Sequence, residues 1–81
     1  MKPDDRVRLQ HMRDAAREAL SFIQGRTRTD LDTDRMLTLA LLKSIEIIGE
    51  AAGCISDEVR NACPDIPWRQ IVNMRHRLIH G

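Results

Sequence analysis

The chain ends on the sequence MRHRLIHG, in which Arg75, His76, Arg77 and His80 gather two guanidinium groups and two imidazoles. Arginine keeps its positive charge at ordinary pH and presents a planar fork of donors that fits a phosphate group. Histidine gains and loses a proton near neutral pH, so it can serve as a general acid or base. This cluster therefore predicts either part of an active site or a basic helix end in contact with solvent.

Arg75 and His80 have the spacing Arg-x4-His, which alone carries little information because Arg6 and His11 share it. Two positions five residues apart are separated by about 140° around the axis of an α-helix. The two side chains of such a pair therefore point to different sides of a straight helix. For Arg75 and His80 to act together, the helix end must distort, or two subunits must meet around one cleft.

His76 and His80 lie four residues apart and do share a helix face. Pairs of histidines at this spacing bind zinc in some metalloproteases. Here Arg77 follows the first histidine, where its charge repels a metal ion, and no third ligand lies nearby in the sequence. We therefore expect no metal and no cofactor at this site.

The segments that must position these residues are helical by their pattern. Apolar residues recur every three or four positions in four segments, and no segment has the alternation of a strand. The predicted helices run from Asp4 or Asp5 to about Gln24, from about Thr33 to Ala52, from an N-cap at Ser56 to about Ala62, and from Pro67, at the first helical position, to the end of the chain.

Gly25 is placed to end the first helix, because a glycine often follows the last helical residues. Residues 25–34 are polar and are predicted to form a loop, with the N-cap of the second helix at Asp30, Asp32 or Thr33. The predicted fold class is all-α.

The second predicted helix is apolar over more than half of its circumference, so it must be contacted from several sides. In so short a chain this requires a bundle, or a bundle and a second subunit. Gly49 lowers helix stability by about 1 kcal/mol relative to alanine, and close packing of another helix is the expected reason for it. Glu50 either orients the guanidinium of Arg75 or belongs, with Glu46, to a solvated face.

The composition favours one small helical domain spanning residues 1–81. Aromatic residues make up only 2% of the chain, so the core must be mainly aliphatic, with Trp68 as its expected anchor. The net charge of +1 indicates neither nucleic acid nor membrane binding by itself. Two cysteines are too few for a disulfide framework, and neither a signal peptide nor a membrane-spanning run is visible, so a soluble cytoplasmic protein is expected.

Three motifs resemble the HepT-like branch of the HEPN family in their order and spacing. They are Ile45-Glu46-Ile47-Ile48-Gly49-Glu50-Ala51, then Ile66-Pro67-Trp68, then Met74-Arg75 leading to Leu78-Ile79-His80. The resemblance is close from the second predicted helix onward and loose over the first. It implies an antiparallel up-and-down helical bundle that forms a homodimer, in which both subunits line one cleft.

Members of that family are ribonuclease toxins paired with a minimal nucleotidyltransferase antitoxin, and Arg75 and His80 match its two catalytic positions. The resemblance thus implies metal-independent cleavage of RNA, with Arg75 clamping the phosphate and His80 moving a proton between the ribose 2′-hydroxyl and the leaving oxygen. His76 stands where the family commonly has asparagine, as a hydrogen-bond partner or a second proton-transfer group. Arg69 and Arg77 either contact RNA phosphates or lie on a solvated face.

The chain departs from the family pattern after His80, where members continue with one residue, a tyrosine and a further helix. Gly81 is the last residue here, so the resemblance implies a C-terminally truncated domain of about four helices. The antitoxin attaches nucleotide to that tyrosine, so this control is not expected, and apolar area on the second and fourth predicted helices is expected to be exposed. Two alternatives stay open: a catalytically inactive dimerisation or antitoxin-binding protein, and an RNA-binding module.

Overall fold

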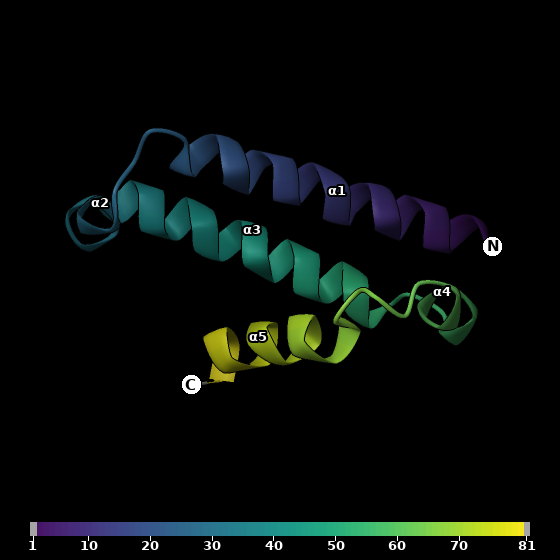
Figure 1. The fold of residues 1–81 in the computed structure, drawn as a ribbon. Coiled ribbons are helices and arrows are strands. Elements are labelled where there is room, and N and C mark those ends of the chain that lie inside the picture. The colour runs from purple at the N-terminus through teal and green to yellow at the C-terminus, as the bar shows by residue number, and fades with distance from the viewer. Residues whose placement is uncertain (1, 81) are drawn as a thin grey trace.

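The part of the chain that the structure describes folds into two long antiparallel helices and three shorter ones (Figure 1). The computed structural model describes the backbone of residues 2–80 and the side chains of residues 2–77. Within these residues every regular element is helical, which confirms the predicted all-α fold. The helices are α1 Pro3–Ile23, α2 Arg28–Thr33, α3 Arg35–Gly53, α4 Asp57–Ala62 and α5 Trp68–His80.

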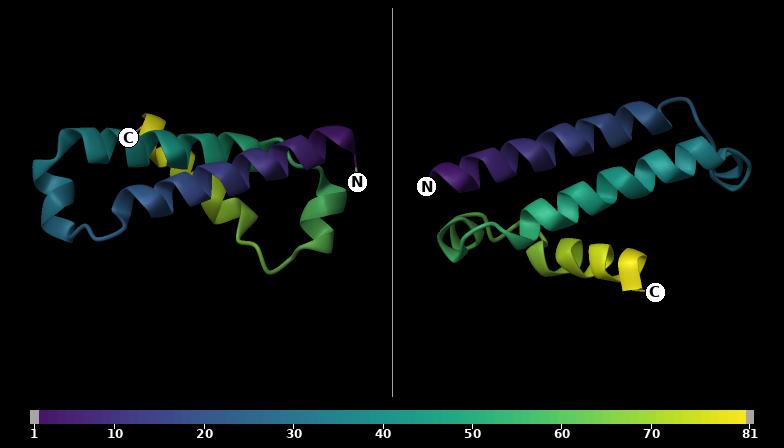
Figure 2. Two further views of the ribbon diagram at one scale, coloured as in Figure 1. Left: turned by 90° about the horizontal axis from the view of Figure 1, so that it is seen from above. Right: turned by 180° about the vertical axis from the view of Figure 1, so that it is seen from behind.

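Helix α3 is the centre of the arrangement, because α1 packs along one side of it and α5 along another. Both α1 and α5 run antiparallel to α3, as in an up-and-down bundle (Figure 1). Seen from above, α5 crosses the pair of long helices obliquely (Figure 2). These two contacts explain why the sequence of α3 is apolar on several sides.

Helix α1 begins at Pro3, whose fixed φ suits the first helical position and whose missing N–H is not needed there. The helix ends at Ile23, and Gly25 follows two residues later with φ of 73°. A left-handed conformation of this kind costs glycine nothing sterically. Gly25 therefore ends the first helix, as the sequence predicts.

Residues 25–34 are not the predicted loop, because six of them form α2. Thr27 caps this helix: its hydroxyl accepts a hydrogen bond from the N–H of Asp30, while the Asp30 carboxylate accepts one from the N–H of Thr27. The N-cap of α3 is Asp34, whose carboxylate accepts a hydrogen bond from the N–H of Leu37 at 3.1 Å. The prediction that Asp30, Asp32 or Thr33 would be this N-cap is therefore wrong. The capping box of Thr27 and Asp30 thus stabilises a short helix at the corner between α1 and α3, within the polar residues 25–34.

A buried carboxylate fixes α4 to α1. Ser56 is the N-cap of α4, as predicted, and its hydroxyl accepts from the N–H of Val59 at 3.4 Å. The carboxylate of Asp5 in turn accepts from the Ser56 N–H at 2.9 Å and from the Ser56 hydroxyl at 2.7 Å. Asp5 is only 2% exposed, so its carboxylate needs partners within the protein, and Ser56 supplies them across this contact between the two helices.

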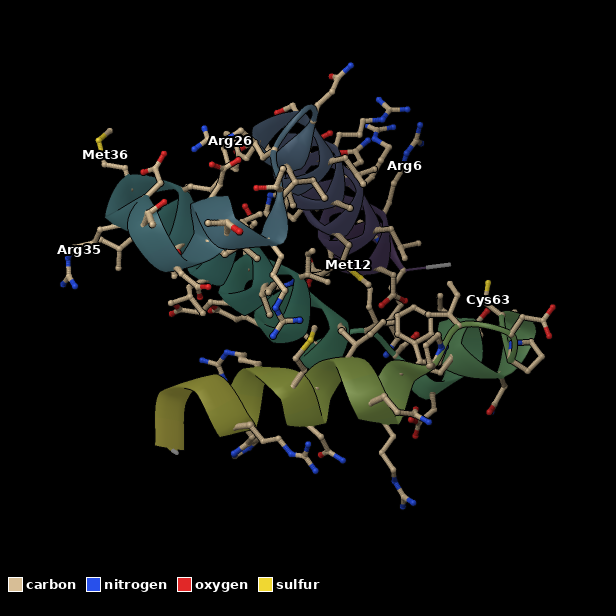
Figure 3. All side chains as sticks on the ribbon, turned by 60° about the vertical axis from the view of Figure 1, so that its left-hand side comes forward. Arg6, Met12, Arg26, Arg35, Met36 and Cys63 are labelled. Atoms are coloured by element: carbon tan, nitrogen blue, oxygen red, sulfur yellow. The ribbon has the colours of Figure 1, made fainter. Side chains whose placement is uncertain are left out.

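A small core lies where α1, α3, α4 and α5 meet. Trp68 is 7% exposed and donates its indole N–H to the carbonyl of Cys63 at 3.0 Å, which confirms it as the core anchor. Figure 3 shows Met12 directed from α1 towards this junction, whereas Met36 points away from the body of the molecule. The core residues are Ala52, Ile55, Val59 and Trp68, with Leu9, Met12, Ile66, Ile71 and Val72 packed around them.

Two further expectations are corrected by the structure. The described residues hold five helices instead of about four, because α2 was not foreseen. Helix α5 begins at Trp68, one residue after the predicted Pro67, whose carbonyl accepts from the N–H of Ile71 at 3.0 Å. The boundaries of α1 and α3 differ from the predicted ones by one or two residues.

Candidate active site on helix α5

Helix α5 has two different faces, and Arg75 lies on the one that packs against the rest of the molecule. Trp68, Val72 and Arg75 follow one another at intervals of four and three residues, so they share one side of the helix. Trp68 and Val72 belong to the core, and Arg75 is half-buried. An arginine therefore occupies a position where the helix pattern calls for an apolar residue.

Helix α3 meets Arg75 at Gly49, which is buried in the middle of α3. A Cβ atom added to Gly49 would overlap the Cβ of Arg75 and would lie only 3.1 Å from its Cδ and 3.2 Å from its Cγ. Only the hydrogen of a glycine fits between the two helices at this point. The predicted reason for Gly49, close packing of another helix, is thus confirmed, and the stem of Arg75 is the group that packs there.

The Nε of Arg75 is buried and makes no hydrogen bond. Leaving a buried N–H unpaired costs about 1–3 kcal/mol, so this position is unfavourable for the fold. Glu50 is exposed, and among the described side chains no hydrogen bond or ion pair joins it to Arg75. The guanidinium of Arg75 is therefore held in place by its stem, with donor capacity left over for an anion.

The opposite face of α5 is polar and exposed. Arg69, Asn73, His76 and Arg77 lie three or four residues apart, so they line one side of the helix, and each is exposed. Three of the predicted site residues are thereby brought to one surface, whose donors suit phosphate and base contacts. A hollow of about 310 Å³ on this surface is lined by Gln70, Asn73, Met74 and Arg77.

His80 is the last residue of α5, and its side chain lies outside the described residues. The backbone stays helical up to this position. On such a helix, positions 75 and 80 are about 140° apart around the axis and about 7.5 Å apart along it, whereas positions 76 and 80 share a side. Position 80 therefore belongs to the polar face with His76 and Arg69, and not to the face of Arg75.

Arg60 connects the start of α5 to the end of α3. Its Nη2 donates to the carbonyl of Ala52, in the last turn of α3, at 2.7 Å. Its guanidinium carbon lies 5.9 Å from the centre of the Trp68 ring. A cation is favourable both at a helix C-terminus and over an indole face, so Arg60 holds in place the turn from which α5 starts.

Hydrogen bonds near helix ends lower the pKa values of three carboxylates. Hydrogen bonds from the hydroxyl and the N–H of Ser56 hold the pKa of Asp5 below its ordinary value. At the α1–α3 corner, the guanidinium of Arg26 lies 2.6 Å from Asp34 and lowers the pKa of that carboxylate. The pKa of Asp30 is lowered first by the N–H of Thr27 and then by Arg26, which Figure 3 shows at this corner. These carboxylates stabilise the scaffold that carries α5.

Large apolar side chains remain exposed on α3 and α5. The exposed fractions are 82% for Met36, 50% for Leu39 and 37% for Leu42 on α3, and 39% for Met74 on α5. These side chains lie on the helices that were predicted to expose apolar area. Large apolar side chains are also exposed on α1 and α2, with Leu20 at 65%, so the apolar area that a partner can cover is spread over several helices.

Two features are absent from the part of the chain that the structure describes. No three histidine, cysteine, aspartate or glutamate side chains there are grouped as metal ligands would be. No helix there has the length and apolar character needed to cross a membrane.

The comparisons with known proteins agree on one family. A family model described as Ribonuclease HepT-like matches residues 12–81, which contain α2, α3, α4, α5 and about half of α1. The protein named "Probable ribonuclease HepT" in Thermococcus cleftensis is 37% identical over 68 residues, covering 79% of this chain and 62% of that protein. "Putative RNase TTE0752" of Caldanaerobacter subterraneus is 35% identical over 72 residues, covering 89% of this chain and 64% of that protein.

A third relative covers almost the whole chain. "Putative RNase MJ1380" of Methanocaldococcus jannaschii is 29% identical over 79 residues, which are 98% of this chain and 72% of that protein. The chain thus spans between 62% and 72% of the length of these three relatives. No solved structure gives a significant match. On the extent of the family match, this chain belongs to the HepT-like ribonuclease family.

Proposed function

We propose that this protein is a metal-independent endoribonuclease in which Arg75 holds the scissile phosphate and His80 is the general acid and base. The state of Arg75 carries the proposal: in a chain of the HepT-like ribonuclease family, its stem is packed on Gly49 and its buried Nε makes no hydrogen bond. Because Arg75 as a whole is only half-buried, the outer nitrogens of its guanidinium are the donors available to a phosphate oxygen. The ribonuclease names of the three relatives support the same activity.

The chemistry uses the ribose 2′-hydroxyl as the nucleophile. His80 takes the hydroxyl proton as the 2′-oxygen attacks phosphorus, the bond from phosphorus to the 5′-oxygen breaks, and the proton is returned to that leaving oxygen. The products are a 2′,3′-cyclic phosphate and a 5′-hydroxyl. Arg75 stays charged throughout and stabilises the negative charge that builds up on the phosphoryl oxygens. DNA lacks the nucleophile and is not a substrate.

The reaction is proposed to take place in a cleft between two copies of the chain. Positions 75 and 80 lie on different sides of α5, so one helix does not aim its own two catalytic groups at one point. In this proposal the accessible part of the Arg75 guanidinium of one protomer meets His80 of the other at the dimer cleft. The exposed Leu39, Leu42 and Met74 support a homodimer, because they offer apolar area for it to bury.

Other side chains of α5 have supporting roles in this proposal. Arg69 and Arg77 lie on the exposed polar face, where they contact RNA phosphates beyond the scissile one. His76 shares that face with position 80 and orients His80 or the substrate by hydrogen bonding. Glu50 is exposed next to Gly49, and its proposed role is to orient the guanidinium of Arg75.

In the cell, the protein is proposed to be the toxin of a cytoplasmic toxin–antitoxin pair with a minimal nucleotidyltransferase as antitoxin. Membership of the HepT-like family supports this role, although the relatives' names state only a ribonuclease. Induced expression of the chain is expected to stop growth. A co-expressed minimal nucleotidyltransferase is expected to restore growth by binding the chain and to co-purify with it, and the absence of both effects contradicts the toxin role.

The activity itself is tested by incubating end-labelled RNA with the chain in EDTA. Arg75→Ala and His80→Ala are compared with Arg6→Ala and His11→Ala, which remove the other pair with the same spacing. We expect cleavage by the parent chain and by both α1 variants, and loss of about 10²-fold or more in both α5 variants. Cleavage that survives His80→Ala contradicts the mechanism. Salt-dependent RNA binding without cleavage identifies an RNA-binding module, and neither activity identifies an inactive scaffold.

A further inference from the structure

The contact between Gly49 and Arg75 joins the centre of the fold to the proposed phosphate clamp. Gly49 is in the middle of α3, the helix that both α1 and α5 pack against, so its position is fixed by the whole bundle. The Cβ, Cγ and Cδ of Arg75 all lie within contact range of a Cβ built on Gly49. The first three carbons of the arginine stem therefore rest directly on the α3 backbone.

This contact restricts the guanidinium more than an ordinary arginine is restricted. A surface arginine moves freely about its long stem, and ordering that stem costs rotamer entropy. Here the stem is packed against a rigid backbone, and the Nε at its end is buried. A phosphate that binds Arg75 therefore meets a guanidinium that is already ordered, and a catalytic group held in this way contributes through its orientation.

We propose that Gly49 is a positioning residue for Arg75, with the absence of its side chain setting the distance of the guanidinium from the reacting phosphate. The inference rests on the proposed function for its catalytic consequence. Gly49 touches no substrate and acts only through Arg75. A methyl group at Gly49 forces α5 away from α3 by roughly 1 Å, since carbon atoms in contact stay about 3.5–4.0 Å apart.

A matched control is present in the same helix. Gly53, four residues after Gly49, is the last residue of α3, and a Cβ built on it meets nothing within 4 Å. Gly49→Ala and Gly53→Ala are therefore the same chemical change in one helix. Both substitutions raise the intrinsic helix propensity. Only Gly49→Ala disturbs Arg75.

The first experiment measures cleavage of an RNA oligonucleotide in EDTA by the parent chain, Gly49→Ala and Gly53→Ala. We expect kcat to fall on the order of 10²-fold in Gly49→Ala, because a catalytic group displaced by about 1 Å loses that much. KM is expected to stay within twofold, and the pH at which the rate is half-maximal within experimental error, because the residues on the outer face of α5 move together with the helix and keep their mutual arrangement. Gly53→Ala is expected to match the parent. Equal kcat in Gly49→Ala and the parent overturns the inference.

The second experiment separates this contact from the proposed activity. Arg75→Gly removes the Cβ that blocks a side chain at position 49. We expect Gly49→Ala to lower Tm by on the order of 5–15 °C in the parent chain and by much less, or not at all, in the Arg75→Gly chain. Equal losses in both chains overturn the inference, because Gly49 is then needed for some other contact. A parent chain that cuts no RNA refutes the proposed function alone, and the Tm comparison still decides whether Gly49 holds Arg75.

Discussion

Replacing Arg75 by methionine should make the protein more stable and abolish its activity. Arg75 lies on the face of α5 that packs inward, its stem rests on Gly49, and its Nε is buried without a partner. Methionine keeps an unbranched stem of similar length on Gly49 and removes the guanidinium. The variant therefore keeps the packing and loses the buried, unpaired N–H.

The size of the effect follows from that one N–H. A buried unpaired donor costs about 1–3 kcal/mol, and the lower end applies because Arg75 is only half-buried. A gain of about 1 kcal/mol corresponds to a rise in Tm of about 4–8 °C for a domain of this size. Arg75→Ala removes the stem as well, so it should be less stable than Arg75→Met.

The assay is thermal and urea unfolding followed by far-UV circular dichroism, at one protein concentration, because a dimer makes Tm depend on concentration. Arg69→Met is the control: it is the same substitution on the exposed face of the same helix, and should change stability by less than about 0.5 kcal/mol. A lower Tm in Arg75→Met than in the parent refutes the reasoning, because it shows that the guanidinium stabilises the free protein. A chain that is more stable and inactive shows instead that Arg75 is kept for function.

Three further predictions concern the scaffold and the proposed dimer. Trp68→Ala should cost about 3–5 kcal/mol in urea unfolding, because it removes the core anchor, its bond to Cys63 and the contact with Arg60; a loss below 1 kcal/mol contradicts this core. The pKa of Asp5 is lowered from 3.8 in the folded protein. The ionised Asp5 therefore contributes its full share of the free energy of unfolding above pH 3.8, and this share is lost as the pH falls through the lowered pKa. Asp5→Asn should therefore be less stable at pH 7 and lose less stability than the parent between pH 4 and pH 2, whereas an unchanged acid dependence argues against the Asp5–Ser56 contact. Leu39→Glu should shift the protein from dimer to monomer in sedimentation without lowering its helix content, and an unaltered dimer excludes that face of α3 from the interface.

Much of the fold could be predicted from the sequence because the signals are local. The apolar periodicity of α1 and α3, the glycine after α1 and the serine before α4 each act within a few residues of where they stand. Gly49 was also informative, since a glycine inside a helix needs a packing reason, and the sequence could not say which residue supplies it. Its partner is 26 positions further along the chain, at Arg75.

The missed features depend on contacts between distant or competing groups. Asp5 and Ser56 are 51 positions apart, and Asp5 by itself is an ordinary acid in the first turn of a helix. Arg60 gives no sign in the sequence that it reaches the end of α3 and the face of Trp68. The corner α2 was missed because it contains several residues that can cap, and the capping box of Thr27 and Asp30 prevailed.

At the candidate site, the sequence identified the residue types, while the structure separates them into two groups. Arg75 lies on the inner face of α5, and Arg69, His76 and Arg77 lie on the outer face. Periodicity can place residues on faces, but it does not reveal that an arginine has taken an apolar position against a glycine. The catalytic pairing of Arg75 with His80 stays a prediction.

The central claim, that RNA is cut by its own 2′-hydroxyl without a metal, has one direct test. The cleavage site of the chain is first mapped in an RNA oligonucleotide, and a second oligonucleotide then carries a single 2′-deoxy nucleotide at that site. In EDTA, we predict no product from the substituted oligonucleotide, full cleavage when the deoxy nucleotide lies one position away, and a 2′,3′-cyclic phosphate on the normal product. Cleavage of the substituted oligonucleotide at the mapped site, or cleavage only after a divalent metal is added, contradicts the account.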